Sequence, residues 1–458
     1  MLKSSNFMRH KPGTTQRANH ATSTLDKCFF AAFLVALALL LLISGSILTV
    51  AGVPPGPQIK RAFEGGKAYY DKLFFHDDVF QSDLWRPART DARHVTINDP
   101  DRTQPGATLY TSGHEASAFL ISMEGEVLHT WHRPFSEVWN DTAAVKDPQP
   151  DSHVFMRKAR LDNNGDLLAI YEGAGDTPYG YGLVKLDKQS NVIWSYLQPA
   201  HHDFDIAPDG RIFVLTHEIA DDFLPQLDHL AAPRLDDFLV ILSPDGKELE
   251  KIPLLATVDN SDYRQLIFEI SSYSLADPLH TNSVHVITDQ EAETFAFGSA
   301  GQVLVSFREL NTVGVIDLEQ EKLVWAERAY WRGQHDPKIL ANGNLLLFDN
   351  NGNFQKPEGR SRVLEFNPTT MEIMWQYTGT AAAPLNSNIR SYTQRLSNGN
   401  TLITESNGGR ILEVTPDHAI VWEYTNPVRG GPNNDLVPVI CKAVRLDPEF
   451  VARFLAIP

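Results

Sequence analysis

Hydrophobic and polar positions follow two different patterns along the chain. No charged residue occurs from Cys28 to Ile59, and the segment FFAAFLVALALLLLISGSILTV (Phe29–Val50) is apolar over 22 residues. A helix of that length spans about 33 Å, which is enough to cross the hydrocarbon layer of a bilayer. Beyond residue 105 the pattern changes to short apolar runs, rich in β-branched and aromatic residues, that end at glycine turns. The sequence therefore predicts one N-terminal transmembrane helix followed by an all-β domain.

The β-rich part repeats one unit, made of a short strand, a glycine turn, a second strand and a closing tryptophan. The turns are Asn164-Gly165, Asp209-Gly210, Ala300-Gly301, Asn342-Gly343 and Asn398-Gly399. Asn-Gly and Asp-Gly between apolar runs are strong hairpin signals, because such turns need positive φ. The closing tryptophans are Trp131, Trp194, Trp325, Trp375 and Trp422. The segment Leu239–Leu254 supplies a further unit with Leu249 in place of the tryptophan. Six units favour a six-bladed β-propeller, with a pair of β-sandwiches as the competing architecture.

The repeat also sets the expected domain organisation. A cytosolic tail (residues 1–27) is expected to precede a transmembrane signal anchor (28–50) and a linker with a short connector (51–104). The propeller (105–430) and a C-terminal extension (431–458) are expected to follow. Two stretches, Glu218–Arg234 and Ala256–Pro278, break the repeat and are expected to be insertions, the second partly helical. A short terminal helix is expected after Asp447, with Asp447 as its N-cap and Pro448 at its first position.

The charge is unevenly distributed along the chain. The whole chain carries 40 basic and 57 acidic residues, a net charge of −17, while residues 1–50 hold five basic residues and one acid. The positive-inside rule then places the N-terminus in the cytosol and the rest on the exported side, periplasmic or extracellular. A cleaved signal peptide is the alternative.

So acidic a chain is not expected to bind nucleic acid. Its two cysteines, Cys28 and Cys441, exclude a disulfide scaffold and a cysteine-rich zinc site.

Candidate chemistry emerges when the units are aligned on their glycine turns. His202 lies eight residues before Gly210 in HHDFDIAPDG, and His335 lies eight residues before Gly343 in HDPKILANG. His280 opens the corresponding strand of the unit LHTNSVHVI. Because the innermost strands of a propeller line its central channel, these three histidines are expected to converge at one end of it.

A guanidinium and further polar groups are expected at the same place. Arg308 ends the antiparallel strand that follows Gly301, so it returns to the histidine end. His201 is expected on the opposite face of its strand from His202, as a supporting residue. Imidazoles beside an arginine suit an anionic sulfuryl or phosphoryl group. Structural histidines and a three-histidine zinc site are the alternatives, although Arg308 would repel a dication, and no metal is expected.

At these residues the chain resembles the bacterial arylsulfate sulfotransferase family, over about residues 105–430. The segments that carry the resemblance are His201–Gly210, His280–Val284, Val303–Val313, Gly333–Asn350 and Ser391–Val414. The resemblance implies an exported six-bladed propeller without a cofactor. It also implies sulfuryl transfer from a phenolic sulfate ester to a phenolic acceptor, independent of 3′-phosphoadenosine 5′-phosphosulfate.

The resemblance also implies roles for individual residues. His335 would be the nucleophile of a ping-pong reaction and would pass through a sulfohistidine intermediate. The residues that would bind the sulfuryl oxygens and handle protons are His202, His280, Asn282 and Arg308. Asn350 and His201 complete the expected substrate-binding set.

The chain departs from this family before the first blade. Well-known members have a substantial N-terminal β domain used in dimerisation, whereas here roughly 50 residues separate the membrane segment from the propeller, so the oligomeric state stays open. The expected partners are an aryl sulfate donor, a phenolic acceptor and, through the N-terminal helix, the membrane. A propeller that binds ligands or partners without catalysis, and an aryl sulfate hydrolase, are the competing functions.

Overall fold

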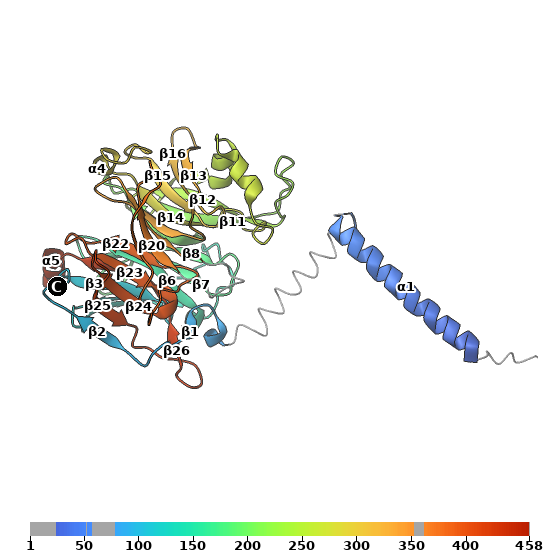
Figure 1. Ribbon diagram of the computed structural model, residues 1–458, viewed down its shortest axis with the longest axis horizontal. Coiled ribbons are helices and arrows are strands. Elements are labelled where there is room, and N and C mark those ends of the chain that lie inside the picture. The colour runs from blue at the N-terminus through green and yellow to red at the C-terminus, as the bar shows by residue number, and fades with distance from the viewer. Residues whose placement is uncertain (1–23, 52, 57–77, 352–360, 458) are drawn as a thin grey trace, which may run out of the picture. The chain divides into compact units, whose positions relative to one another are not determined.

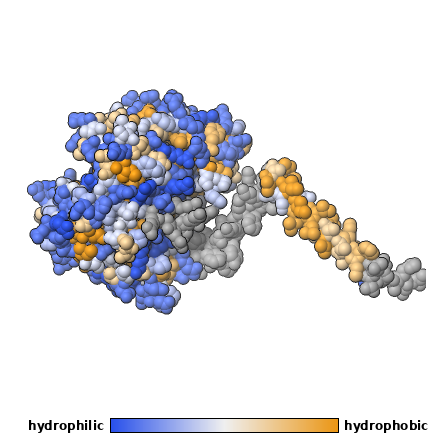
Figure 2. Space-filling view, in the orientation of Figure 1, coloured by the Kyte–Doolittle hydropathy of each residue, from blue (hydrophilic) through white to orange (hydrophobic). Residues whose placement is uncertain are grey.

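The computed structural model describes residues 24–51, 53–56, 78–351 and 361–457, and the chain divides into two units, Met1–Phe75 and His76–Pro458. In the first unit, α1 (Thr24–Val50) is a single helix, and its residues Lys27–Val50 have a mean hydropathy of 2.7 in their most apolar window. Figure 2 shows apolar residues along α1 and a largely polar visible face on the second unit. The predicted apolar helix is confirmed and is consistent with a membrane anchor or a signal sequence. The basic tail of residues 1–23 lies outside the described residues.

The second unit is a six-bladed β-propeller, as the repeat predicts (Figure 1). Each blade is an antiparallel sheet, named here from its innermost strand outward. Blade 1 is β27 (Ile440–Leu446), β3 (Ala107–Ser112), β4 (Ser117–Ile121) and β5 (Val127–His132). Blade 2 is β6 (Val154–Leu161), β7 (Leu167–Gly173), β8 (Gly180–Leu186) and β9 (Val192–Tyr196). Blade 3 is β10 (Ala200–Ile206), β11 (Ile212–Ala220), β12 (Arg234–Leu242) and β13 (Glu248–Pro253).

The remaining blades follow in chain order. Blade 4 is β14 (Thr281–Val286), β15 (Val303–Phe307), β16 (Thr312–Asp317) and β17 (Lys322–Glu327). Blade 5 is β18 (His335–Ile339), β19 (Leu345–Asp349), β20 (Arg362–Phe366) and β21 (Ile373–Tyr377). Blade 6 is β22 (Tyr392–Arg395), β23 (Thr401–Glu405), β24 (Arg410–Val414), β25 (Ile420–Thr425) and a fifth strand, β2 (His94–Asn98). A separate pair joins β1 (Trp85–Pro87) to β26 (Leu436–Pro438).

Strands from both ends of the second unit complete the propeller. β27 pairs with β3, so the C-terminal strand closes the ring onto the first blade, and β2 extends blade 6 through β25. Both strands lie outside the expected range 105–430. The terminal helix α5 (Pro448–Ala456) follows, and the side chain of Asp447 accepts hydrogen bonds from the backbone N–H of Glu449 at 2.8 Å and Phe450 at 3.4 Å. The predicted cap and its proline are therefore confirmed.

Two interruptions of the repeat form short helices, whereas residues 221–233, between β11 and β12, form turns and irregular loop. The expected partly helical insertion contains α3 (Leu254–Asp259) and the 3₁₀ helix η4 (Arg264–Glu269), and α4 (Asp289–Ala292) interrupts blade 4. Apolar side chains of α3 and η4 are buried in one cluster with blades 3 and 4. The other 3₁₀ helices are η1 (Val79–Gln81), η2 (Phe135–Glu137), η3 (Asp151–His153) and η5 (Ser406–Gly408).

The six innermost strands contact one another in a closed ring, in the order β6, β10, β14, β18, β22 and β27. Five of them break register with their neighbour near the same end; the breaks lie between Met156/Lys158, Ala200/Phe204, Thr281/Ser283, His335/Lys338 and Ile440/Lys442. Residues at this end also adopt positive φ, among them His202 at 54°, His280 at 45° and Asp336 at 55°. A β-bulge re-aims the side chains beside it. The fold thus presents irregular backbone, and the side chains it carries, at one end of the channel.

Candidate active site

The histidine and arginine predicted to meet in blade 4 do so. β14 and β15 pair Thr281 with Phe307, which places the preceding His280 beside the following Arg308. The backbone N–H of Arg308 donates to the carbonyl oxygen of His280 at 3.3 Å. The ring of His202 in blade 3 packs edge-on against His280, with ring centroids 4.9 Å apart. Three of the predicted residues therefore lie together across two blades.

His335 begins β18 in the neighbouring blade, and its partners define its tautomer. Its Nδ1 lies 2.8 Å from Asn350 Oδ1 and 3.0 Å from the carbonyl oxygen of Gly333. The Asn350 amide is oriented by its own N–H groups, which donate to the carbonyl oxygens of Ser387 at 2.8 Å and Arg390 at 2.9 Å. Since both atoms facing Nδ1 are acceptors, Nδ1 carries the proton and Nε2 carries the lone pair.

His335 and His202 are held in the neutral form. Burial lowers the pKa of His335 well below its usual range, and the charges of Arg157 and Arg308 lower it further. Burial likewise lowers the pKa of His202, with the charge of His280 as the next cause. A neutral imidazole keeps the lone pair that a nucleophile or base needs.

His280 has the opposite tendency, because a carboxylate lies against it. Burial disfavours its charged form, but the charge of Asp277 and a hydrogen bond from Nδ1 to Asp277 Oδ2 at 2.5 Å outweigh burial, so the pKa of His280 is raised. The site therefore combines one imidazole with a raised pKa and two with lowered pKa values. Groups whose environments separate their pKa values in this way are typical of acid–base sites.

His201 does not lie on the opposite face from His202, as the alternation of a regular strand predicts. The Nδ1 atoms of the two rings are 2.7 Å apart, so one donates a hydrogen bond to the other. The physical reason is the β-bulge of β10, where His202 adopts a positive φ of 54° and the two-residue alternation is lost. His201 thus contacts His202 directly.

Asn282 links β14 to the backbone beside His335. It is the extra residue of the β14 bulge, and its Nδ2 donates to the carbonyl oxygen of Gln334 at 2.8 Å. Its Oδ1 is buried without a hydrogen-bond partner among the described residues. Asn282 therefore holds one acceptor available at the same end of the channel.

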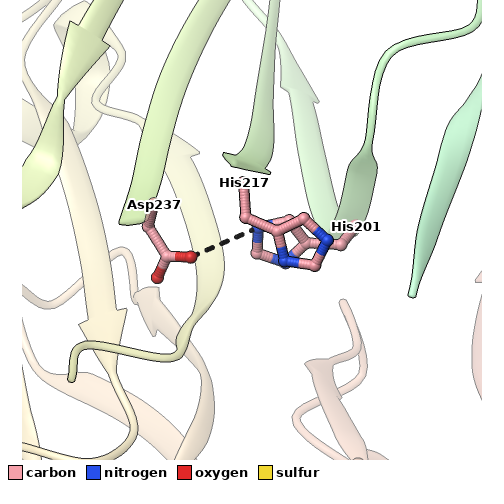
Figure 3. A group of neighbouring side chains, drawn as sticks. All are labelled: His201, His217 and Asp237. Carbon is pink, nitrogen blue, oxygen red and sulfur yellow. Dashed lines mark ion pairs between the residues drawn. The ribbon is translucent and has the colours of Figure 1, made fainter. Parts of the chain in front are cut away.

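One group of side chains has the composition of a metal site. His201, His217 and Asp237 come from β10, β11 and β12, and their ligand atoms lie within 4.8 Å of one another (Figure 3). The His201 and His217 rings are stacked, with centroids 4.4 Å and planes 19° apart, and Asp237 Oδ1 lies 3.6 Å from His201 Nε2. An imidazole binds a metal through a lone pair in the plane of its ring. Two nearly parallel, stacked rings cannot direct their in-plane lone pairs at the same point. The three residues are therefore of the right type to bind a metal ion, but their orientation does not suit one.

The structure adds residues that the sequence reasoning missed. Arg157 on β6 lies eight residues before Gly165, the same offset that identified the histidines, so the repeat held a signal for it. Asp277 lies in an insertion without a repeat, and no sequence pattern marks it as the partner of His280. Tyr179, between β7 and β8, packs its ring 5.5 Å from the ring of His202 and 6.1 Å from that of His280.

The family assignment comes from comparison with protein families. A family model described as Arylsulfotransferase (ASST) matches residues 158–427, more than half of the chain. The chain belongs to the arylsulfotransferase family. The matched range contains the residues that gather at the channel end of this arylsulfotransferase family member, namely His202, His280, Arg308 and His335. No curated protein matches the chain.

Solved structures similar to this arylsulfotransferase family member have low identity to it. A protein of unknown function from Bacteroides caccae is 13% identical with a TM-score of 0.46, and the alignment covers 74% of this chain and 98% of that one. A streptogramin B lyase is 13% identical with a TM-score of 0.40, over 78% of this chain and 94% of that one. A virginiamycin B lyase from Staphylococcus aureus is 11% identical with a TM-score of 0.34, and the alignment covers 60% of this chain and 70% of that one. Similarity at this level says nothing about the activity of this chain.

Proposed function

We propose that the protein transfers a sulfuryl group from a phenolic sulfate ester to a phenolic acceptor, through a sulfohistidine at His335. The observation that carries this proposal is the tautomer of His335. The Nδ1–H of His335 donates hydrogen bonds to Asn350 and Gly333. Burial favours the neutral ring, so Nε2 keeps its lone pair. A neutral imidazole with a fixed orientation is a competent nucleophile toward sulfur.

In the first half-reaction the Nε2–S bond forms and the bond between sulfur and the phenolic oxygen breaks. The electron pair of that bond leaves on the phenolate oxygen. Negative charge on the three sulfuryl oxygens is stabilised by donors that are already oriented, Arg308 and His280. The protonated His280 can give its proton to the departing phenolate, since Asp277 favours the imidazolium form.

In the second half-reaction the acceptor phenol replaces the first one. Its oxygen attacks sulfur, its proton returns to His280, and the S–N bond breaks to restore neutral His335. The two halves use the same groups in opposite directions, which is the basis of a ping-pong mechanism.

We further propose that α1 anchors the chain in a membrane, with the propeller on the exported side.

The test measures phenol released from a chromogenic aryl sulfate, with and without added phenolic acceptor. The account predicts release by the wild type that rises with acceptor, and loss of turnover by at least about a thousandfold in His335→Ala, as for other covalent nucleophiles. His418→Ala, in the exposed turn between β24 and β25, is the matched control and is expected to match the wild type. Full activity in His335→Ala contradicts the assigned nucleophile.

The same assay separates the competing functions. Release that does not respond to acceptor, with sulfate as the product, indicates a hydrolase. No release from a broad panel of aryl sulfates indicates a propeller that binds without catalysis.

A further inference from the structure

Arg157 occupies in blade 2 the repeat position that the site histidines occupy in blades 3 and 5. It lies eight residues before Gly165, as His202 lies before Gly210 and His335 before Gly343. It is also the extra residue of the β6 bulge, between Met156 and Lys158. The innermost strand of blade 2 therefore delivers a guanidinium to the end of the channel where the histidines gather.

The guanidinium of Arg157 is buried but incompletely satisfied. Arg157 is 1% exposed, and its Nη1 has no hydrogen-bond partner among the described residues. Its Nε lies 3.6 Å from Glu172 Oε2, and its guanidinium carbon lies 5.7 Å from the centre of the Tyr392 ring. A buried N–H group normally has an acceptor. The unpaired Nη1 therefore indicates an acceptor that the described part of the chain does not supply.

The neighbours of Arg157 also position His202. Glu172 Oε1 accepts the backbone N–H of His202 at 2.7 Å, and the Tyr392 hydroxyl donates to the carbonyl oxygen of His202 at 3.4 Å. Toward His335, Arg157 is the strongest of the neighbouring charges that lower the pKa of that imidazole, after burial and ahead of Arg308. Arg157 thus lies beside the residues that hold the backbone of His202, and its charge acts on the nucleophile of the proposed reaction.

A purely structural ion pair with Glu172 does not account for this arrangement. The separation of 3.6 Å is longer than a charge-assisted hydrogen bond, and the closest atom to Glu172 is Nε, so the pair does not satisfy Nη1. Burying a guanidinium for so loose a contact is unfavourable, because desolvation costs more than the attraction returns.

We infer that Arg157 is a second sulfuryl-binding arginine, whose Nη1 donates to an oxygen of the aryl sulfate and of the sulfuryl group on His335. Arg308, whose Nη1 pairs with Glu309, approaches from blade 4 and Arg157 from blade 2, so two guanidinium groups serve three sulfuryl oxygens. This role rests on the proposed function, and its test is designed to separate the two.

The experiment compares Arg157→Gln, Arg157→Lys and the matched control Arg160→Gln in the full chain. Arg160 lies on the same strand, its side chain is 45% exposed and it pairs with Asp205 at 2.9 Å, so the control removes an arginine of β6 outside the site. Each variant is assayed for kcat/KM toward a chromogenic aryl sulfate, KM for the phenolic acceptor, and Tm. Binding of inorganic sulfate is measured separately by calorimetry.

We expect Arg157→Gln to lower kcat/KM for the aryl sulfate by about 100- to 1000-fold, as the loss of one preorganised donor does in other sites. Arg157→Lys keeps the charge without the fork and is expected to lose less, by about tenfold. The KM for the neutral acceptor is expected to stay close to the wild-type value, and Arg160→Gln to retain most of its activity. Sulfate binding is expected to weaken in Arg157→Gln and to persist in Arg160→Gln.

Two results would overturn the role of Arg157. One is a kcat/KM of Arg157→Gln close to that of the wild type at an unchanged Tm. The other is an equal loss in Arg160→Gln, which would mean that the effect is not specific to the site. If the wild type binds sulfate through Arg157 but transfers no sulfuryl group, the proposed function fails while the anion site stands.

Discussion

Single residues of the same repeat position acquire different chemistry from their neighbours. His335 faces two acceptors and two arginines and is neutral, while His280 faces Asp277 and favours the charged form. The offset from the glycine turns predicted that His202 and His335 gather, and the position of His280 at the start of the corresponding strand added the third histidine. It could not supply the protonation states, because the partners come from loops and insertions that follow no repeat.

Asp277→Asn tests the assignment of the acid. The wild-type carboxylate raises the pKa of His280, so the proton-donating form persists as pH rises until that pKa is passed. The variant removes the charge while burial still disfavours the imidazolium, so the pKa of His280 falls. We expect the alkaline limb of the kcat/KM profile to move to lower pH.

Asp259→Asn in the same insertion is the control, since Asp259 pairs with Arg264 rather than with a histidine. An alkaline limb that stays in place in Asp277→Asn would show that His280 is not the proton donor.

The sequence predicted the face of His201 wrongly and passed over Arg157. A regular strand alternates its side chains, but the bulge of β10 brings His201 and His202 into contact. A bulge depends on pairing with the neighbouring strand, so the strand's own sequence does not reveal it. Arg157, in contrast, shared the offset of the histidines and was recognisable before the structure.

Elements at the ends of the second unit complete the propeller. The hairpins were predictable because each glycine turn is a local signal. The closing pair of β27 with β3, and the addition of β2 to blade 6, join strands more than 300 residues apart, and such pairing leaves no local signal in the sequence. The helix α5 follows β27 directly and packs Phe454 against the Trp131 ring of blade 1, with ring centroids 5.4 Å apart.

Phe454→Ala tests whether α5 stabilises this closure. The side chain is 2% exposed, and its loss leaves a cavity beside Trp131. We expect the free energy of unfolding to fall by about 3–5 kcal/mol, as for other buried phenylalanines. Chemical denaturation measures it, provided the transition is reversible.

Leu455→Ala on the same helix is the control, because Leu455 is 45% exposed and its removal is expected to cost under about 1 kcal/mol. Equal losses in the two variants would mean that Phe454 adds nothing to the closure.

At the scale of the whole molecule, the chain combines an acidic composition with a site that holds two arginines and three histidines. Its net charge is −17, and the positive excess of residues 1–50 makes the remainder more acidic still. Arg157, Arg308 and His280 gather at the channel end against that background. The negative charge of the chain therefore repels an anionic aryl sulfate at long range. The aryl sulfate is attracted only at short range, by the cationic groups of the site.

The central claim is that His335 carries the sulfuryl group between donor and acceptor. The most direct measurement is mass spectrometry of the protein after incubation with an aryl sulfate in the absence of acceptor, with fragmentation to locate the modified residue. The account predicts a sulfuryl adduct on His335 that disappears when phenol is added and does not form in His335→Ala. Phenol release without any adduct, or an adduct on another residue that passes to phenol, would contradict it.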